Sequence, residues 1–269
     1  MLEQNRFNPR ERPCRIERYE YTRPKNASLT WRRVYLACSE LPIRHIELCF
    51  DGSYTSLPVT GDRKARFTHC LHWPSLLPTQ LRELVALLNE ALVLPTGGAF
   101  DAVFTLDWYK TPDDTRPPVQ WENTPTGELV RHAKYFGFAE RRKARKELVR
   151  RLADALEKHP ALNSAIYMVS VPGHAGDGTS TGEQIAADLA QRTGQTLIRT
   201  VGRARPQRKD DQSVDLTGMF TMPRSLDAPC VIVDDVYRSG ATIREVARVA
   251  RRAGAPRVYG LVAAKTLRS

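Results

Sequence analysis

The chain has 269 residues, 41% of them hydrophobic and 26% charged, so it can bury a sizeable core and is unsuited to wholesale disorder. Its 41 Lys and Arg residues exceed its 30 Asp and Glu residues, and the formal net charge of +11 favours an anionic partner. The longest unbroken apolar run spans only residues 165–169 and the five cysteines form no CxxC pair, which argues against a membrane helix and a disulfide framework and for a cytoplasmic protein.

The first half of the chain indicates an extended arm followed by a small mixed module. Residues 1–30 are polar, with scattered proline and arginine and little periodicity, and form the basic arm. Apolar runs and a 3.6-residue spacing then predict strands over 34–38, 43–50, 65–71 and 100–108, and a helix over 79–94. We therefore assign residues 31–109 to an N-terminal α+β module of unknown role and the proline-rich residues 110–125 to a linker.

The second half alternates between helices and strands. Helices are predicted over about 126–136, 139–158, 182–193 and 241–253, and strands over 165–171, 196–201, 217–222, 230–236 and 257–265. Such alternation is typical of βαβ units, so residues 126–269 are expected to form an α/β domain with a mainly parallel, doubly wound sheet. Ligands of such sheets bind outside the carboxyl ends of the strands.

The segment VIVDDVYRSGAT, residues 231–242, combines the strongest strand with polar residues at its carboxyl end. Asp234 and Asp235 would be costly in an apolar core, so they should face a polar or cationic ligand. Gly240 permits close backbone approach, and the helix start after it favours a phosphate. Ser239 and Thr242 add hydroxyl donors. A pentose diol on the acids with a phosphate on the loop is the ligand that this order of residues suits.

This segment resembles the signature of type I phosphoribosyltransferases, which bind 5-phosphoribosyl-1-pyrophosphate (PRPP). The resemblance implies that Asp234 and Asp235 hold the ribose hydroxyls. It also implies a 5′-phosphate loop made of Arg238, Ser239, Gly240, Ala241 and Thr242. Purine-salvage members carry an acid where this chain has Arg238, so activation of an acceptor base by that acid is not expected here. Enzymes of this type use Mg²⁺, which the resemblance implies to be bound mainly through the ligand, with Asp234 and Asp235 as the nearest carboxylates.

The resemblance extends over residues 123–269 and is nearest to the competence protein F (ComF) branch. It rests on the segments GELVRHAKYFGF (127–138), YMVSVPGH (167–174), RPQRK (205–209) and GMF (218–220). It implies a pyrophosphate loop formed by Val171, Pro172, Gly173 and His174. It further implies a basic hood over the leaving group, with Arg205, Arg208 and Lys209 as catalytic cations beside the acid pair.

Positive charge is concentrated in two segments. Residues 131–151 hold nine Lys and Arg residues against two Glu, and residues 1–33 hold nine basic against four acidic side chains. Aromatic residues lie among the arginines in and directly after the first segment, an arrangement that can stack on bases or anchor an arm in a core. They are Tyr19, Tyr21, Trp31 and Tyr35. Nucleic-acid binding through both segments is one expectation, and a solvated helix face at residues 139–151 is the alternative.

Two functions follow from these features. The first is a PRPP-dependent phosphoribosyltransferase that transfers the 5-phosphoribosyl group to a nitrogen nucleophile and releases pyrophosphate. The second is a PRPP or nucleotide sensor or effector that works with nucleic acid, as relatives do in DNA uptake or beside the reverse transcriptases of retron antiphage systems. The sequence leaves open the acceptor and whether the chain forms a homo-oligomer or a complex with another protein.

Overall fold

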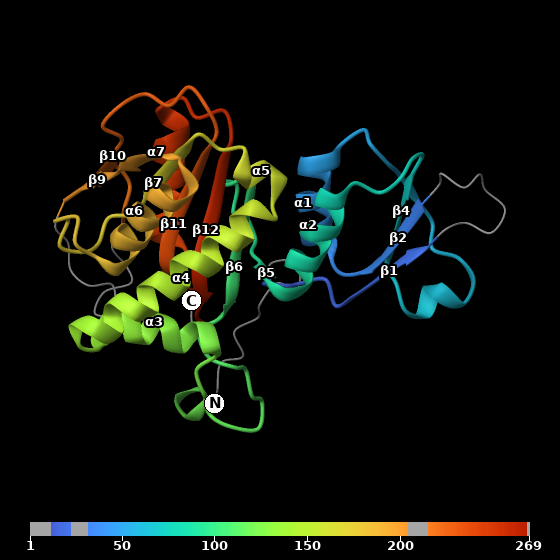
Figure 1. Ribbon diagram of the computed structural model, residues 1–269, viewed down its shortest axis with the longest axis horizontal. Coiled ribbons are helices and arrows are strands. Elements are labelled where there is room, and N and C mark those ends of the chain that lie inside the picture. The colour runs from blue at the N-terminus through green and yellow to red at the C-terminus, as the bar shows by residue number, and fades with distance from the viewer. Residues whose placement is uncertain (1–11, 23–31, 204–214, 268–269) are drawn as a thin grey trace. The chain divides into compact units, whose positions relative to one another are not determined.

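A computed structural model describes residues 12–22, 32–203 and 215–267, and the chain divides into two compact units at Pro95 and Thr96 (Figure 1). This division differs from the expected module over 31–109. The strand β6 (Ala102–Trp108) pairs in parallel with β12 (Val258–Lys265), so β6 belongs to the second unit. The proline-rich segment consequently connects two elements of that unit rather than two domains.

The first unit contains an antiparallel sheet with the strand order β1-β2-β4-β3. Leu81, Leu84 and Leu88 are fully buried along one face of the helix α2, as their spacing predicts. The helix is expected to continue to residue 94 but ends at Glu90, and the short strand β5 begins at Leu92. The elements are β1 (Arg18–Thr22), β2 (Arg32–Ala37), α1 (Glu40–Phe50), β3 (Thr55–Leu57), the 3₁₀ helix η2 (Gly61–Ala65), β4 (His69–Trp73), α2 (Thr79–Glu90) and β5 (Leu92–Val93).

The strand expected over residues 43–50 is wrong, because this segment is the helix α1. Ile43 and Ile46 are both buried, and their spacing of three residues places them on one helical face. Pro42 lies in the first turn, where a missing N–H costs no intrahelical hydrogen bond. The strand expected over 65–71 begins only at His69, because η2 precedes it.

The second unit is built on a parallel sheet, in which β6, β12, β11, β7 and β8 lie side by side in that order (Figure 1). The expected mainly parallel α/β fold is thereby confirmed. Its other elements are η3 (Pro118–Gln120), α3 (Pro125–Tyr135), α4 (Phe138–Glu157), α5 (Pro160–Asn163), β7 (Tyr167–Ser170), α6 (Thr181–Thr193), β8 (Thr196–Arg199), β9 (Val201–Gly202), β10 (Phe220–Thr221), β11 (Cys230–Tyr237) and α7 (Ala241–Arg252).

The connections of this sheet run in two directions. The chain leaves β7 through α6 and returns in β8 on one side, and it leaves β11 through α7 and returns in β12 on the other. The direction of winding therefore reverses between β7 and β11, which is where open α/β sheets form a crevice for ligands. Leu148 and Leu152 of α4 are fully buried beneath an exposed, charged outer face. Among the described helices, none has the length and apolar character needed to cross a membrane.

Candidate functional site

The carboxyl end of β11 extends past the end of β7. Ser170, the last residue of β7, pairs with Val233, whereas β12 continues alongside β11 as far as the pair Tyr237 and Lys265. Asp234 is half-buried and Asp235 is buried, so both acids lie directly beyond the reach of β7. The acid pair therefore lies at the carboxyl end of the sheet, at the point where its winding reverses.

Asp235 forms an ion pair with a residue from a distant part of the chain. The Nζ atom of Lys134, at the end of α3, lies 2.9 Å from Asp235 Oδ2. Burial alone would lower the pKa of the Lys134 ammonium, but the opposite charges of Asp235 and Asp234 and the hydrogen bond to Asp235 raise the pKa on balance. The Lys134 ammonium therefore stays charged at neutral pH and fixes the Asp235 carboxylate.

Asp234 is packed against the first turn of α6. Its Oδ1 atom accepts a hydrogen bond of 2.8 Å from the backbone N–H of Asp235. A Cβ atom added at Gly182 would lie only 2.8 Å from the same oxygen. The glycine thus leaves room for the carboxylate in its present orientation.

The loop after β11 makes a tight turn into α7. Gly240, the residue before the helix, has φ +73°, and a Cβ atom there would lie 2.1 Å from the ring of Tyr237. Both facts require glycine at this position. Ser239 Oγ accepts a weak hydrogen bond of 3.4 Å from the N–H of Ala241. The start of α7 thus presents backbone N–H groups and hydroxyls near a helix terminus, a combination that suits an anion.

Two cationic side chains donate hydrogen bonds to residues of this turn and of the strand before it. Lys265 Nζ donates to the carbonyl oxygen of Arg238 at 2.9 Å, and Arg244 donates to the hydroxyl of Tyr237 at 3.0 Å. Burial, and secondarily the charge of Arg244, lower the pKa of Lys265 to about 8. The Arg238 side chain itself is exposed. The loop therefore has a fixed backbone and an outward-facing guanidinium.

The segment after β7 is held by the buried acid Glu183. One oxygen of this carboxylate accepts hydrogen bonds from the backbone N–H groups of Gly173 and Ser180 and from the Ser180 hydroxyl, at 3.1, 3.2 and 2.6 Å. A Cβ atom at Gly173 would lie 2.6 Å from Ser180 Cβ, so the loop touches the start of α6. Val171 and Pro172 are buried and His174 is exposed.

The expected hood residues Arg205, Arg208 and Lys209 lie outside the described residues. The strands on either side of them, β9 and β10, pair antiparallel with Gly202 opposite Phe220. A Cβ atom at Gly202 would lie 3.1 Å from Pro172 Cβ. The described residues that flank the hood segment therefore lie beside the loop that follows β7.

Three residues of this site did not emerge from the sequence as functional candidates. Glu183 could have been found, because Ser180 and Glu183 have the spacing of a capping box, and both of its hydrogen bonds are present. Gly182 is a glycine inside a helix, which often indicates close approach of another group. Lys134 gives no local signal, because it lies on α3 and its partner Asp235 lies on β11, about a hundred residues later in the chain.

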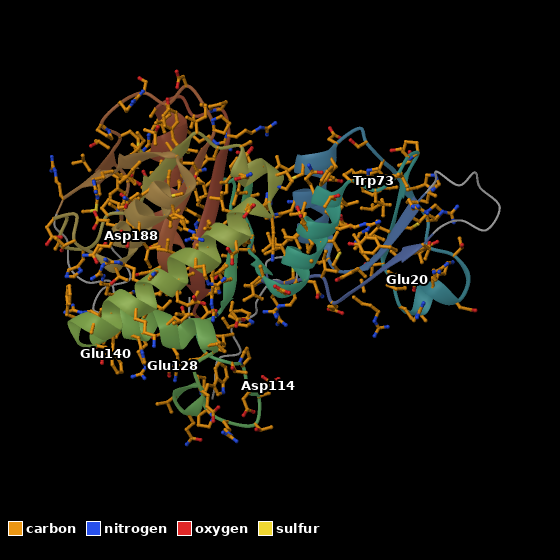
Figure 2. All side chains as sticks on the ribbon, viewed as in Figure 1. Glu20, Trp73, Asp114, Glu128, Glu140 and Asp188 are labelled. Atoms are coloured by element: carbon orange, nitrogen blue, oxygen red, sulfur yellow. The ribbon has the colours of Figure 1, made fainter. Side chains whose placement is uncertain are left out.

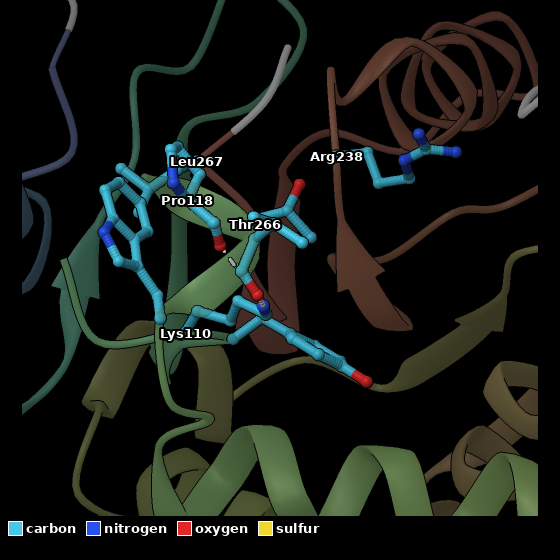
Figure 3. A pocket seen from close by; sticks show the side chains of 8 residues that line it. Lys110, Pro118, Arg238, Thr266 and Leu267 are labelled. Carbon is cyan, nitrogen blue, oxygen red and sulfur yellow. Dashed lines mark hydrogen bonds between the residues drawn. The ribbon is translucent and has the colours of Figure 1, made fainter. Parts of the chain in front are cut away.

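A cavity of about 350 Å³ opens beside Arg238 (Figure 3). Its walls come from the ends of β6, β11 and β12 and from the proline-rich segment. The lining residues are Tyr109, Lys110, Pro118, Val119, Trp121, Arg238, Thr266 and Leu267. Lys110 Nζ donates to the carbonyl oxygens of Pro118 and Val119, and Trp121 Nε1 donates to those of Asp113 and Arg116, so this wall is fixed by its own hydrogen bonds.

The carboxylates of Asp234 and Asp235 offer the hard oxygen ligands that Mg²⁺ prefers. Asp235 is also engaged with Lys134, and within residues 12–22, 32–203 and 215–267 there is no group of three His, Cys, Asp or Glu side chains able to hold a metal. This donor set fits an ion that takes most of its ligands from water and from a bound phosphate compound.

No protein-family model and no curated protein matches the chain. Three solved structures with some likeness to the chain are phosphoribosyltransferases. The orotate enzyme of Aeropyrum pernix is 20% identical with a TM-score of 0.31, and the match covers 48% of this chain and 64% of that one, less than two thirds of its length. The purine enzyme of Pyrococcus horikoshii is 16% identical (TM-score 0.33; 50% and 88% covered). The adenine enzyme of Thermoanaerobacter pseudethanolicus is 15% identical (TM-score 0.31; 59% and 94% covered).

Proposed function

We propose that the chain binds PRPP together with Mg²⁺ and transfers its 5-phosphoribosyl group to a nitrogen nucleophile, with release of pyrophosphate. One observation carries the proposal: the acid pair Asp234 and Asp235 leads directly into the Gly240 turn and α7, at the reversal point between β7 and β11. Paired carboxylates match the two ribose hydroxyls, and a helix start matches a phosphate. The family resemblance of residues 231–242 favours the same ligand.

Each part of the ligand has a proposed partner. Asp234 and Asp235 accept hydrogen bonds from the ribose 2′ and 3′ hydroxyls, and Lys134 holds Asp235 in place for this role. The backbone N–H groups and hydroxyls of residues 238–242 bind the 5′-phosphate. The loop of residues 171–174 faces the pyrophosphate, and Glu183 fixes this loop by accepting a hydrogen bond from the Gly173 N–H.

In the proposed reaction the bond between C1′ and the pyrophosphate oxygen breaks and a bond from C1′ to the acceptor nitrogen forms. Pyrophosphate leaves with the bonding electron pair, and the nitrogen releases its proton to solvent. Negative charge accumulates on the leaving oxygen, so cations and N–H groups near it stabilise the transition state. Arg205, Arg208 and Lys209 are proposed for this role on the strength of the resemblance.

Mg²⁺ would neutralise the phosphate charges when it is bound with the ligand, and Asp234 and Asp235 are the carboxylates that would hold its hydration shell. The acceptor would approach from the cavity beside Arg238. The aromatic and proline side chains of that wall suit a flat apolar group, and the cavity is large enough for one.

Calorimetric titration with PRPP and Mg²⁺ tests the ligand site directly. The wild-type chain should release heat, and Asp234→Asn combined with Asp235→Asn should abolish it. Pyrophosphate release is then measured across a panel of nitrogenous bases and amines. Binding followed by turnover supports the transferase, binding without turnover on any acceptor supports the sensor or effector, and absence of binding overturns both.

A second variant separates the site from the fold. In Gly182→Ala the added Cβ would meet Asp234 Oδ1, so the carboxylate must rotate, while alanine suits a helix better than glycine. We expect PRPP affinity to fall about ten-fold or more with no loss of thermal stability. Gln191→Ala, an exposed position on the same helix, is the matched control. Equal affinities in the two variants would contradict a role for the Asp234 orientation.

A further inference from the structure

The outer surface of α4 and the end of α6 carry cations for which the described part of the chain provides no acidic partner. We define the cationic strip as Arg141, Arg142, Lys143 and Lys146 of α4 with Arg192 of α6. All five side chains are exposed, and within the described residues none of them forms an ion pair.

Two of the acids beside the strip, Glu147 and Asp188, are already engaged by other arginines, so among the described residues Glu140 is the remaining acid of α4 near the strip. Glu147 lies 2.8 and 2.9 Å from Arg150 and Arg151. Asp188, on α6, lies 2.8 Å from Arg145. Figure 2 shows Asp188 on α6 and Glu140 near the beginning of α4. The local surface therefore keeps a positive potential.

The strip is hollowed in two places that adjoin each other. A hollow of about 370 Å³ is lined by Arg142, Arg145, Lys146, Val149, Asp188 and Arg192, four cations against one acid. A second hollow of about 620 Å³ shares Lys146 and Arg192 with the first. The second hollow is lined by the cations Lys143, Lys146, Arg150 and Arg192 and by the acids Glu140 and Glu147. Concave surfaces that are lined mainly by one sign of charge raise the local concentration of counter-charged groups, here phosphates.

Two large aromatic side chains lie exposed at the beginning of the strip. Tyr135, the last residue of α3, is 66% exposed, and Phe138, the first residue of α4, is 77% exposed. Neither contributes to the core, although rings of this size are normally the best core residues. Aromatic rings beside cations form the stacking platforms that bind unpaired bases.

From these observations we propose that the strip, with Tyr135 and Phe138, binds single-stranded nucleic acid. The phosphates of the strand contact the cations of α4 and α6, and its bases stack on the two rings. Duplex nucleic acid has no unpaired bases to offer these rings. An anionic membrane is disfavoured because the apolar face of α4, including Leu148 and Leu152, is buried in the core and unavailable for insertion.

Tyr135, which we place beside the strip, is close in sequence to a residue of the proposed pentose phosphate site. Tyr135 follows Lys134 directly, and the Lys134 ammonium contacts Asp235. The binding inference itself needs no PRPP, because it depends only on charge and exposed rings. A chain that fails to bind PRPP could therefore still bind single-stranded nucleic acid, and a chain that fails to bind nucleic acid could still bind PRPP.

The test measures fluorescence anisotropy of a labelled 30-nucleotide single strand of mixed sequence with the full chain. If about five phosphates are neutralised, the logarithm of the binding constant should fall with the logarithm of salt concentration with a slope of about −3.5, which is about 100-fold between 50 and 200 mM salt. Arg142→Glu, Lys146→Glu and Arg192→Glu combined should reduce that slope by about 2. The control reverses the same number of exposed charges at Arg44, Lys64 and Lys158.

The aromatic contribution is tested separately with Tyr135→Ala combined with Phe138→Ala. This variant should lose about 5-fold or more in affinity for the single strand, keep the salt slope, and lose little affinity for a duplex. Thermal unfolding confirms that each variant is folded. Equal weakening by the strip and control reversals overturns the proposal, as does tighter binding to duplex or to anionic phospholipid vesicles.

Discussion

Lys134 and Asp235 join α3 to the tip of β11 through one largely buried ion pair, with side-chain exposures of 26% and 12%. Removal of either partner leaves the other charge poorly solvated. We expect Asp235→Asn to lower the free energy of unfolding by about 2 kcal/mol, as for the loss of a hydrogen bond to a charged group. Lys134→Met combined with Asp235→Asn should cost less than the sum of the single changes.

Urea denaturation of the two single variants and the double variant gives this coupling as a double-mutant cycle. A coupling energy of about 1 kcal/mol or more is expected for groups in direct contact. Additive effects would mean that the pair contributes nothing beyond its separate side chains. In that case Lys134 would have no positioning role toward Asp235.

Lys265 provides a prediction about pH. Burial is the main reason that its pKa in the folded protein lies at about 8, below the ordinary lysine value of 10.5. Between these two pH values the unfolded chain binds more protons than the folded one, so stability attributable to this residue rises with pH. From pH 8 to pH 10 the unfolding free energy of the wild type should therefore rise by about 1 kcal/mol relative to that of Lys265→Met, after allowance for partial exposure. A difference that stays flat over this range would contradict burial of the charge.

At the scale of elements, the Tyr237 ring packs against Gly240 in the turn between β11 and α7 and leaves no room there for a side chain. Gly240 and Gly178 have nearly the same φ angle, +73° and +77°, in the left-handed region. A Cβ atom at Gly240 would overlap the Tyr237 ring, whereas one at Gly178 has nothing within 4 Å. Gly178→Ala should therefore cost only the conformational strain of about 1–2 kcal/mol. Gly240→Ala should cost about 2 kcal/mol more from overpacking and should weaken PRPP binding.

Thermal denaturation of the two variants isolates the effect of the ring. The same comparison in a Tyr237→Ala background should show almost equal costs, because the overlap is then absent. If Gly240→Ala remains the more damaging change without the ring, the backbone of the turn has a requirement that Tyr237 does not explain.

The elements that could be predicted from the sequence are those whose signals are local. The apolar run 230–233 gives β11, and Ser180 with Glu183 and Gly194 marks both ends of α6. The prediction for residues 43–50 is wrong because their apolar positions fit a strand as well as one face of a helix. In the structure they form α1, which buries Ile43 and Ile46 within the first unit. The acid pair could be placed at a strand end, but its partner Lys134 could not, since a long-range ion pair leaves no pattern along the chain.

At the scale of the whole molecule, β6 decides where the second unit begins. Val103 and Phe104 are fully buried, and Thr105 Oγ1 donates to the carbonyl oxygen of Ala263 at 2.9 Å. Phe104 also stacks on His159. Burial of the two apolar side chains contributes about 3–6 kcal/mol, which is comparable with the net stability of an ordinary domain. Without β6, β12 would lose the strand that pairs with one of its edges.

Two fragments test this boundary. Residues 96–269 keep β6 together with the acid pair, both loops and Lys134, so this fragment should unfold cooperatively in urea and bind PRPP within about 2-fold of the full chain. Residues 126–269 lack β6 and also Thr124, whose hydroxyl caps α3 and donates to the carbonyl oxygen of Trp108. This shorter fragment should show no cooperative transition, because the loss of about 3–6 kcal/mol leaves little net stability. Equal stability of the two fragments would place the boundary after residue 109 instead, and would mean that β6 adds no stability to the strand it pairs with.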